Sequence, residues 1–206
     1  MSGKKKNSVE LQFGYEDKES PEVKHRTVVF SKRPTGADFI SAIESTNGEE
    51  PDYILAMMTP AISAFGHLPM PVPMTVLLSL NWRDRELLTA AFFEFLGNTS
   101  GGEAKSLDGG KVQMSFGIER DGVKYTTVAF GAMMTAYDEI AVRKEADSVI
   151  ERNVLTMGRE IVKISSADGI HQIDGGLTLS ELKNLDWEDF VSLQSAEESW
   201  RNSFRV

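Results

Sequence analysis

An internal repeat constrains the fold of this chain more than any other feature of its sequence. Residues 9–16 (VELQFGYE) recur at 112–119 as VQMSFGIE. Three further matches follow in the same order: 27–30 with 127–130, 35–38 with 135–138, and 80–84 with 185–189. The offset between the copies changes only inside turns. We therefore expect two diverged copies of one folding unit.

The matched segments first predict a β-hairpin in each copy. Every second residue from Val9 to Tyr15 is apolar, and the segment at 112–119 alternates in the same way, which is typical of a strand with one buried face. Asp121-Gly122 favours a tight hairpin turn because these residues tolerate positive φ. We expect return strands near 24–30 and 124–130, with a longer first turn around residues 19–21.

About three short helices are expected after each hairpin. Thr-x-x-Asp at Thr35 and Thr135 predicts a capped helix start, and the same is expected of the Asp84 and Asp189 segments. Between these helices lie apolar residues that would share one helical face. They are Leu55, Met58, Ile62 and Phe65 in the first copy, and Val154, Met157, Ile161 and Ile164 in the second.

These elements predict an α+β protein made of two tandem repeats, each a β-hairpin packed on about three short helices. We divide the chain into a disordered basic tail (1–7), repeat 1 (8–97), a Gly-rich linker (98–110) and repeat 2 (111–206). A lone hairpin is marginally stable, so its apolar face must pack on its own helices or on the other copy.

Composition and motifs argue against several classes of function. The net charge of −9 disfavours nucleic-acid binding, and no apolar run approaches the ~18 residues of a membrane helix. The chain has no cysteine, and His25, His67 and His171 lack metal-ligand spacing. We therefore predict a protein that is not an enzyme, with no catalytic residue, no metal site, no cofactor, no nucleic-acid partner and no membrane partner.

Candidate protein-binding residues come from a difference between the copies. Leu87, Phe92, Phe93 and Leu96 align with Ser192, Glu197, Glu198 and Arg201, so the last helix of the first copy is apolar nearly all round. Such a helix must bury a second face, against the other repeat, a second subunit of a homo-oligomer, or a client protein. Met70, Val72 and Met74, which alternate with prolines, offer a second adaptable apolar surface.

The segment at 26–97 resembles a known family. Its strand, the sequence SKRPTGAD at 31–38, and the later LNWRD at 80–84 followed by a helix ending FFEFL resemble tail assembly chaperones of tailed bacteriophages, especially Mu-like ones. The outline is also similar, less closely, to baseplate hub assembly proteins of T4-like phages. The second copy shares this resemblance only through the repeat, since Gly131-Ala132-Met133-Met134 replaces the Arg-Pro segment.

The resemblance implies a role in virion morphogenesis in the host cell cytoplasm. The protein would bind the tape-measure protein, or a tube or baseplate component, and keep it soluble until the tail tube polymerises. The alternative is a structural component of the tail or baseplate, located in the virion tail.

Overall fold

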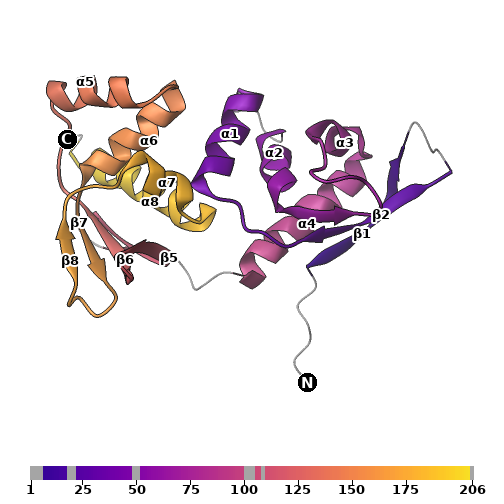
Figure 1. The fold of residues 1–206 in the computed structure, drawn as a ribbon, viewed down its shortest axis with the longest axis horizontal. Helices are drawn as coiled ribbons and strands as arrows, with labels where there is room; N and C mark the ends of the chain where they lie inside the picture. The colour runs from indigo at the N-terminus through magenta and orange to yellow at the C-terminus, as the bar shows by residue number, and fades with distance from the viewer. Residues whose placement is uncertain (1–6, 18–21, 48–51, 100–104, 108–109, 205–206) are drawn as a thin grey trace. The chain divides into compact units, whose positions relative to one another are not determined.

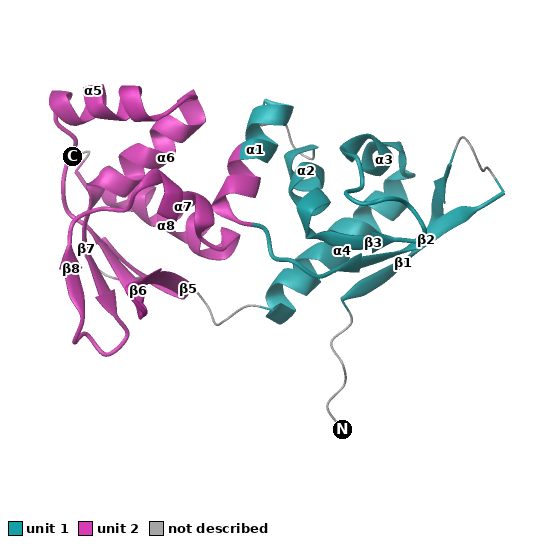
Figure 2. Cartoon of the chain, in the orientation of Figure 1, with its two compact units in different colours: residues 1–34, 41–99 teal, residues 35–40, 100–206 magenta. Residues whose placement is uncertain are grey.

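The chain forms two compact units, and each unit combines two segments that are not adjacent in the sequence. The structure, a computed structural model, describes residues 7–17, 22–47, 52–99, 105–107 and 110–204. Unit 1 comprises residues 1–34 and 41–99, and unit 2 comprises residues 35–40 and 100–206 (Figure 2). Each unit combines an antiparallel sheet with helices, so the α+β class and the two similar units are confirmed.

Unit 1 is built on a three-stranded sheet of order β1-β2-β3. Its strands are β1 (Ser8–Glu16), β2 (Lys24–Phe30) and β3 (Ile62–Phe65). The helices of the first repeat are α1 (Gly36–Thr46), α2 (Asp52–Ala61), α3 (Met74–Ser79) and α4 (Trp82–Thr99). Helix α4 packs along β1 and β2, which buries the apolar side of the hairpin (Figure 1).

Unit 2 repeats this plan with additional strands at both edges, in the order β4-β5-β6-β7-β8. Its strands are β4 (Lys105–Leu107), β5 (Lys111–Arg120), β6 (Val123–Phe130), β7 (Ile161–Ser166) and β8 (Gln172–Asp174). Its helices are α5 (Ala136–Glu145), α6 (Val149–Glu160), α7 (Leu179–Asn184) and α8 (Trp187–Asn202). Helix α8 packs on β5, as α4 packs on β1.

Matching aromatic contacts connect sheet and last helix in both units. The rings of Phe30 and Phe95 stack with centroids 5.6 Å apart in unit 1. The rings of Phe130 and Trp200 stack at 6.0 Å in unit 2. The aligned residues thus have the same surroundings, which confirms the duplication inferred from the sequence.

The predicted second hairpin turn is confirmed. Asp121 and Gly122 have φ values of 51° and 74°, the positive pair that a two-residue type I′ turn requires. The first hairpin turn at 19–21 lies outside the described residues. So does the predicted tail except for Asn7, whose carbonyl accepts the Phe30 N–H at 2.8 Å.

Within the described residues, each repeat has four helices and a further strand that pairs with the return strand of the hairpin, where we predicted about three helices and a hairpin. The predicted helical face at Leu55–Phe65 and its counterpart were wrong in their second halves. Helix α2 ends at Ala61 and α6 at Glu160, so Ile62 and Ile161 begin strands β3 and β7. Those strands pair with β2 and β6, and their buried residues still face the core.

The predicted linker at 98–110 also contains regular structure. Helix α4 continues to Thr99, and β4 pairs with β5 at one edge of the unit 2 sheet. Within the described part of the chain, no helix is both long and apolar enough to span a membrane.

Candidate functional site

Two buried aspartates hold the first strand of each hairpin, β1 in unit 1 and β5 in unit 2, onto the last helix of its unit. The Asp84 carboxylate accepts hydrogen bonds from the backbone N–H groups of Gln12 (2.7 Å), Phe13 (3.0 Å) and Gly14 (2.8 Å). The Asp189 carboxylate accepts from Ser115 (2.6 Å), Phe116 (2.9 Å) and Gly117 (2.8 Å). The predicted helix starts at Asn81 and Asp186 are confirmed, because each side chain accepts a backbone N–H of the first turn. The prediction that Asp84 and Asp189 reach back to these caps was wrong, since both carboxylates bind the strand.

A bulge in the strand presents these N–H groups to the carboxylate. The pairing of β1 with β2 shifts register between Glu10 and Tyr15, and β5 shifts in the same place. Gly14 and Gly117 have φ values of 76° and 75°, and a Cβ on Gly117 would lie 2.4 Å from the Tyr125 carbonyl oxygen. The bulge breaks the predicted strict alternation and leaves Phe13 exposed.

The Asp189 carboxylate binds the backbone of its own unit. Burial raises the pKa of this carboxyl, and the three backbone N–H groups offset part of that rise by stabilising the ionised form. All three bonds go to the unit's own backbone. This arrangement satisfies backbone donors that the bulge would otherwise leave unpaired in a buried place.

The two predicted helix starts at Thr35 and Thr135 are confirmed as reciprocal caps. The Asp38 carboxylate accepts the Thr35 N–H at 2.8 Å, and the Asp138 carboxylate accepts the Thr135 N–H at 2.9 Å. In the second copy, the bonds from the Thr135 hydroxyl and backbone lower the pKa of Asp138. The two segments therefore share one backbone shape.

The candidate protein-binding residues divide into exposed and buried groups. Leu87 is 42% exposed, Phe93 is 44% exposed and Met70 is 40% exposed. Met74 is half-buried at the start of α3. Phe92, Leu96 and Val72 are buried inside unit 1 and cannot meet a partner.

The aligned residues of unit 2 explain why Phe92 and Leu96 are buried. In unit 2 these positions hold Glu197 and Arg201, and the Arg201 guanidinium is ion-paired with Glu197 (2.6 Å) and with Glu160 (2.9 Å). In unit 1, Ala61 stands where Glu160 does. The apolar residues of α4 thus replace a buried ionic cluster, and the second face they were predicted to need lies within their own unit.

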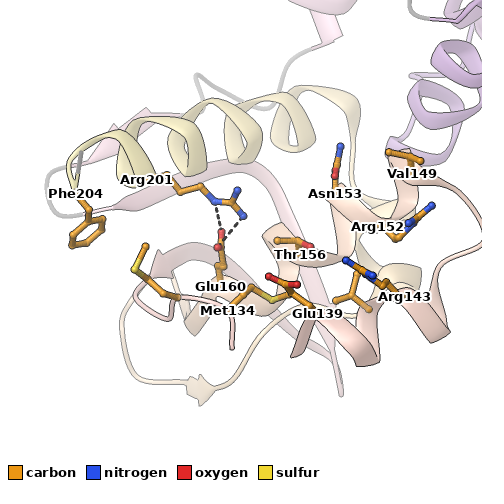
Figure 3. A pocket seen from close by; sticks show the side chains of 12 residues that line it. Met134, Glu139, Arg143, Val149, Arg152, Asn153, Thr156, Glu160, Arg201 and Phe204 are labelled. Atoms are coloured by element: carbon orange, nitrogen blue, oxygen red, sulfur yellow. Dashed lines mark hydrogen bonds and ion pairs between the residues drawn. The ribbon is translucent and has the colours of Figure 1, made fainter. Parts of the chain in front are cut away.

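The ionic cluster keeps two carboxylates close together. Burial raises the pKa of Glu197, Arg201 opposes the rise, and the neighbouring Glu160 adds to it. Glu160 and Arg201 of this cluster line a pocket of about 640 Å³ in unit 2. Figure 3 shows Arg143, Arg152 and Arg201 around this pocket, with Arg201 bonded to Glu160.

The lining of this pocket includes two carboxylates, Glu139 and Glu160. The Glu160 carboxylate is held by two bonds to Arg201, and neither His67 nor His171 lines the pocket. His67 instead donates its backbone N–H to His25 Nδ1 at 3.1 Å. Among the described residues, no cluster of three or more His, Cys, Asp or Glu side chains could hold a metal ion.

A second cleft, in unit 1, lies beside the exposed start of α4. It has a volume of about 590 Å³ and is lined by Leu55, Trp82, Arg85, Glu86, Thr89 and Ala90. Trp82 is 55% exposed. The Nε of Arg85 is buried and has no hydrogen-bond acceptor within the described ranges. Because Arg85 lines the cleft, a carboxylate entering it would meet this cationic side chain.

The Arg-Pro segment quoted for the family resemblance has a structural role here. The Arg33 guanidinium donates to the Leu96 carbonyl at 2.5 Å and to the Thr99 hydroxyl at 2.7 Å, so it binds the carbonyl end of α4. This contact of Arg33 was not predicted from the sequence. Comparisons of the chain with protein-family models, with curated proteins and with solved structures found no match.

Proposed function

We propose that this protein works by binding other proteins, as a phage tail assembly chaperone that holds the tape-measure protein during tail morphogenesis. The observation that carries the proposal is the exposure of Leu87 and Phe93 on α4, whose opposite face is already buried in the core of unit 1. Large apolar side chains on the solvent side of a helix favour an interaction surface, and Leu87 and Phe93 both lie on the exposed side of α4.

Unit 2 provides an internal reference for this surface. Helix α8 packs on its sheet as α4 does, yet Ser192 and Glu198 stand where unit 1 has Leu87 and Phe93. The shared fold therefore does not require apolar residues at these positions. Their presence in the first copy is consistent with selection for binding.

The chemistry of the surface suits a helical client. An amphipathic helix binds through apolar side chains on one face, and Leu87 and Phe93 offer apolar contacts of this kind. The net charge of −9 would help to keep such a complex soluble. Both residues also lie within 26–97, the segment that resembles the chaperone family.

The proposal is tested by co-expression with the tape-measure protein encoded in the same genome. We expect the wild-type chain to raise the soluble fraction of the tape-measure protein. The double variant L87S/F93E, which installs the residues of the second copy, should abolish that effect without unfolding unit 1. The control is I170E, because Ile170 is another exposed apolar residue, at 76%, on a loop of unit 2.

Two outcomes would contradict the proposal. One is an unchanged solubility of the tape-measure protein with the wild-type chain. The other is recovery of the protein in stoichiometric amounts from purified virions, which would instead assign it to the tail or baseplate structure.

A further inference from the structure

The first residues of α1 have a docking site that lies in unit 2. Residues Thr35–Ile40 belong to unit 2, where Thr35 forms a β-bridge with Asp186 at the junction of α7 and α8. The Gly36 N–H donates to the Leu185 carbonyl at 2.9 Å. We call Thr35–Ile40 the first helix start.

Apolar contacts complete this docking. The Phe39 ring lies 5.5 Å from the ring of Phe190 and 6.1 Å from that of Trp187. Ile40 is only 3% exposed and is part of the unit 2 core. The first helix start is therefore an integral part of the packing of α7 and α8.

The second repeat has the same helix start without such a cover. Residues 135–140, the second helix start, carry the same reciprocal cap between Thr135 and Asp138. Ile140, which aligns with the buried Ile40, is 53% exposed. A β-branched apolar residue thus faces solvent at the position where its counterpart enters a core.

The first repeat has the corresponding acceptor, and it too is uncovered. The junction of α3 and α4 aligns with that of α7 and α8, so Trp82 corresponds to Trp187 and Arg85 to Phe190. Trp82 is exposed beside the 590 Å³ cleft described above, whereas Trp187 is half-buried. We call this the acceptor cleft.

The two residues that meet in the unit 2 docking site are both replaced at the aligned positions of the second helix start and the acceptor cleft. Phe39 packs on Phe190 in unit 2. In the second helix start and the acceptor cleft, the aligned residues are Glu139 and Arg85. An aromatic pair is thus replaced by a pair of opposite charges, and the Arg85 Nε still lacks an acceptor among the described residues. Glu86 also lines the cleft, so an acidic occupant fits only with its carboxylate at Arg85.

From this correspondence we propose that the second helix start of one copy docks in the acceptor cleft of a second copy, with Glu139 at Arg85 and Trp82, the counterparts of the two rings that Phe39 contacts, and with Ile140 buried as Ile40 is in unit 2. Each chain then offers one donor and one acceptor, which lie on different units. Such a contact is heterologous, so it produces a closed ring or an open head-to-tail chain of molecules.

One residue makes this contact weaker than its internal counterpart. A Cβ on Gly36 would lie 2.4 Å from the Leu182 carbonyl oxygen, and the second helix start has Ala136 at this position. The methyl group of Ala136 must hold the helix start farther from the backbone of α3. We expect A136G to remove this obstacle and to strengthen association about tenfold.

The test is the mass of the full-length chain against concentration, measured by sedimentation and light scattering. The wild-type mass should rise with concentration. I140D and R85E should each weaken association about tenfold or more. The control is Y137D, because Tyr137 is 86% exposed and aligns with Ala37, which is exposed in the docked first helix start. This control should associate like the wild type.

Mixing distinguishes head-to-tail association from a symmetric dimer. The I140D chain keeps its acceptor and the R85E chain keeps its donor, so the two together should form a 1:1 heterodimer and nothing larger. Formation of the heterodimer also establishes that both variants are folded. The double reversal R85E/E139R should recover self-association.

Three results would overturn the proposal. They are a wild-type chain that stays monomeric at its highest soluble concentration, association that I140D and R85E leave unchanged, or mixed variants that do not combine. These measurements need no client, so they are independent of the chaperone function proposed above.

Discussion

At the scale of single residues, Asp84 and Asp189 are the strongest polar anchors of the fold. Each carboxylate accepts three backbone N–H groups from a bulge in its own unit, and each side chain is fully buried. Hydrogen bonds to an ionised group contribute about 1.5–3 kcal/mol each, because the donors have no access to water as an alternative. Strands β1 and β5 therefore each depend on one remote side chain.

The first prediction concerns these two aspartates. D84N and D189N each place an amide NH2 group where a carboxylate oxygen accepts backbone N–H donors. We expect the free energy of unfolding of the affected unit to fall by about 2–4 kcal/mol, because at least one buried donor loses its acceptor. Urea denaturation gives the total loss, and hydrogen exchange locates it in β1 or β5.

Asp186 provides the matched control. Its side chain caps α8 by accepting the Glu188 N–H at 3.0 Å, and asparagine caps a helix about as well as aspartate. D186N should therefore cost far less than D189N. Equal losses in the two variants would contradict the assignment of Asp189 as an anchor of the strand.

Sequence reasoning could find these aspartates but not their role. The pattern Asp-x-x-Asp at 186–189 is the same as that of a helix cap, and Asp186 does cap the helix. The N–H groups that Asp189 binds belong to Ser115, Phe116 and Gly117, which lie 74, 73 and 72 positions earlier in the chain. No local pattern records a contact of that range. The repetition of both the aspartate and the strand glycine, Gly14 and Gly117, was the available signal.

At the scale of elements, strands and helices were predicted correctly where one hydrophobic period continued along the chain. They were predicted wrongly where a helical period passed directly into the period of a strand. The hairpins were found from alternation and from the Asp121-Gly122 turn. The prediction of one continuous helical face was wrong from Ile62 and Ile161 onward. An apolar residue that begins a buried strand directly after a helix can lie at the same sequence spacing as the next apolar residue of that helix. Pairing with β2, which the local sequence does not encode, decides between them.

The two units fill one equivalent region differently, with an ionic cluster in unit 2 and apolar side chains in unit 1. Glu160, Glu197 and Arg201 in unit 2 occupy the places of Ala61, Phe92 and Leu96 in unit 1. A prediction follows for the triple variant E160A/E197F/R201L. We expect it to raise the free energy of unfolding of unit 2 by about 1–4 kcal/mol, because buried ion pairs often contribute less than well-packed apolar residues.

The single variant R201L and the pH dependence test the same cluster. R201L leaves two carboxylates together without their cation, so it should destabilise unit 2, by less than the ~3–5 kcal/mol of a fully buried pair because the Arg201 side chain is 38% exposed. Because the pKa of Glu197 is raised in the folded state, folding is favoured below its ordinary value of 4.5 and this contribution is lost as pH rises through the raised pKa. The triple variant should lack that loss. A pH profile identical to the wild type would argue against the coupling.

At the scale of the whole molecule, the two units do not follow the two repeats. The sequence placed the boundary near 98–110, and unit 1 does end at Thr99. Residues Thr35–Ile40 nevertheless belong to unit 2. Their sequence is a capped helix start in both repeats, and only their partners distinguish them. A repeat identified from its sequence therefore predicts which elements form, but not which copy each element completes.

The last prediction follows from this exchange. A chain of residues 100–206 lacks the first helix start, so the surfaces of Phe190 and Leu182 that Phe39 and Gly36 cover become exposed. Burial of one large apolar side chain stabilises a fold by about 1.5–3 kcal/mol, so with Phe39 and Ile40 missing we expect unit 2 alone to lose about 2–5 kcal/mol. A peptide of residues 33–47 added in excess should restore its melting temperature in a concentration-dependent way, because it binds the folded state. The same peptide with Phe39→Ala and Ile40→Asp should have no effect. If the fragment is as stable as unit 2 in the full chain, or if both peptides act alike, then Thr35–Ile40 is not part of the unit 2 core and the docking model for two copies loses its template.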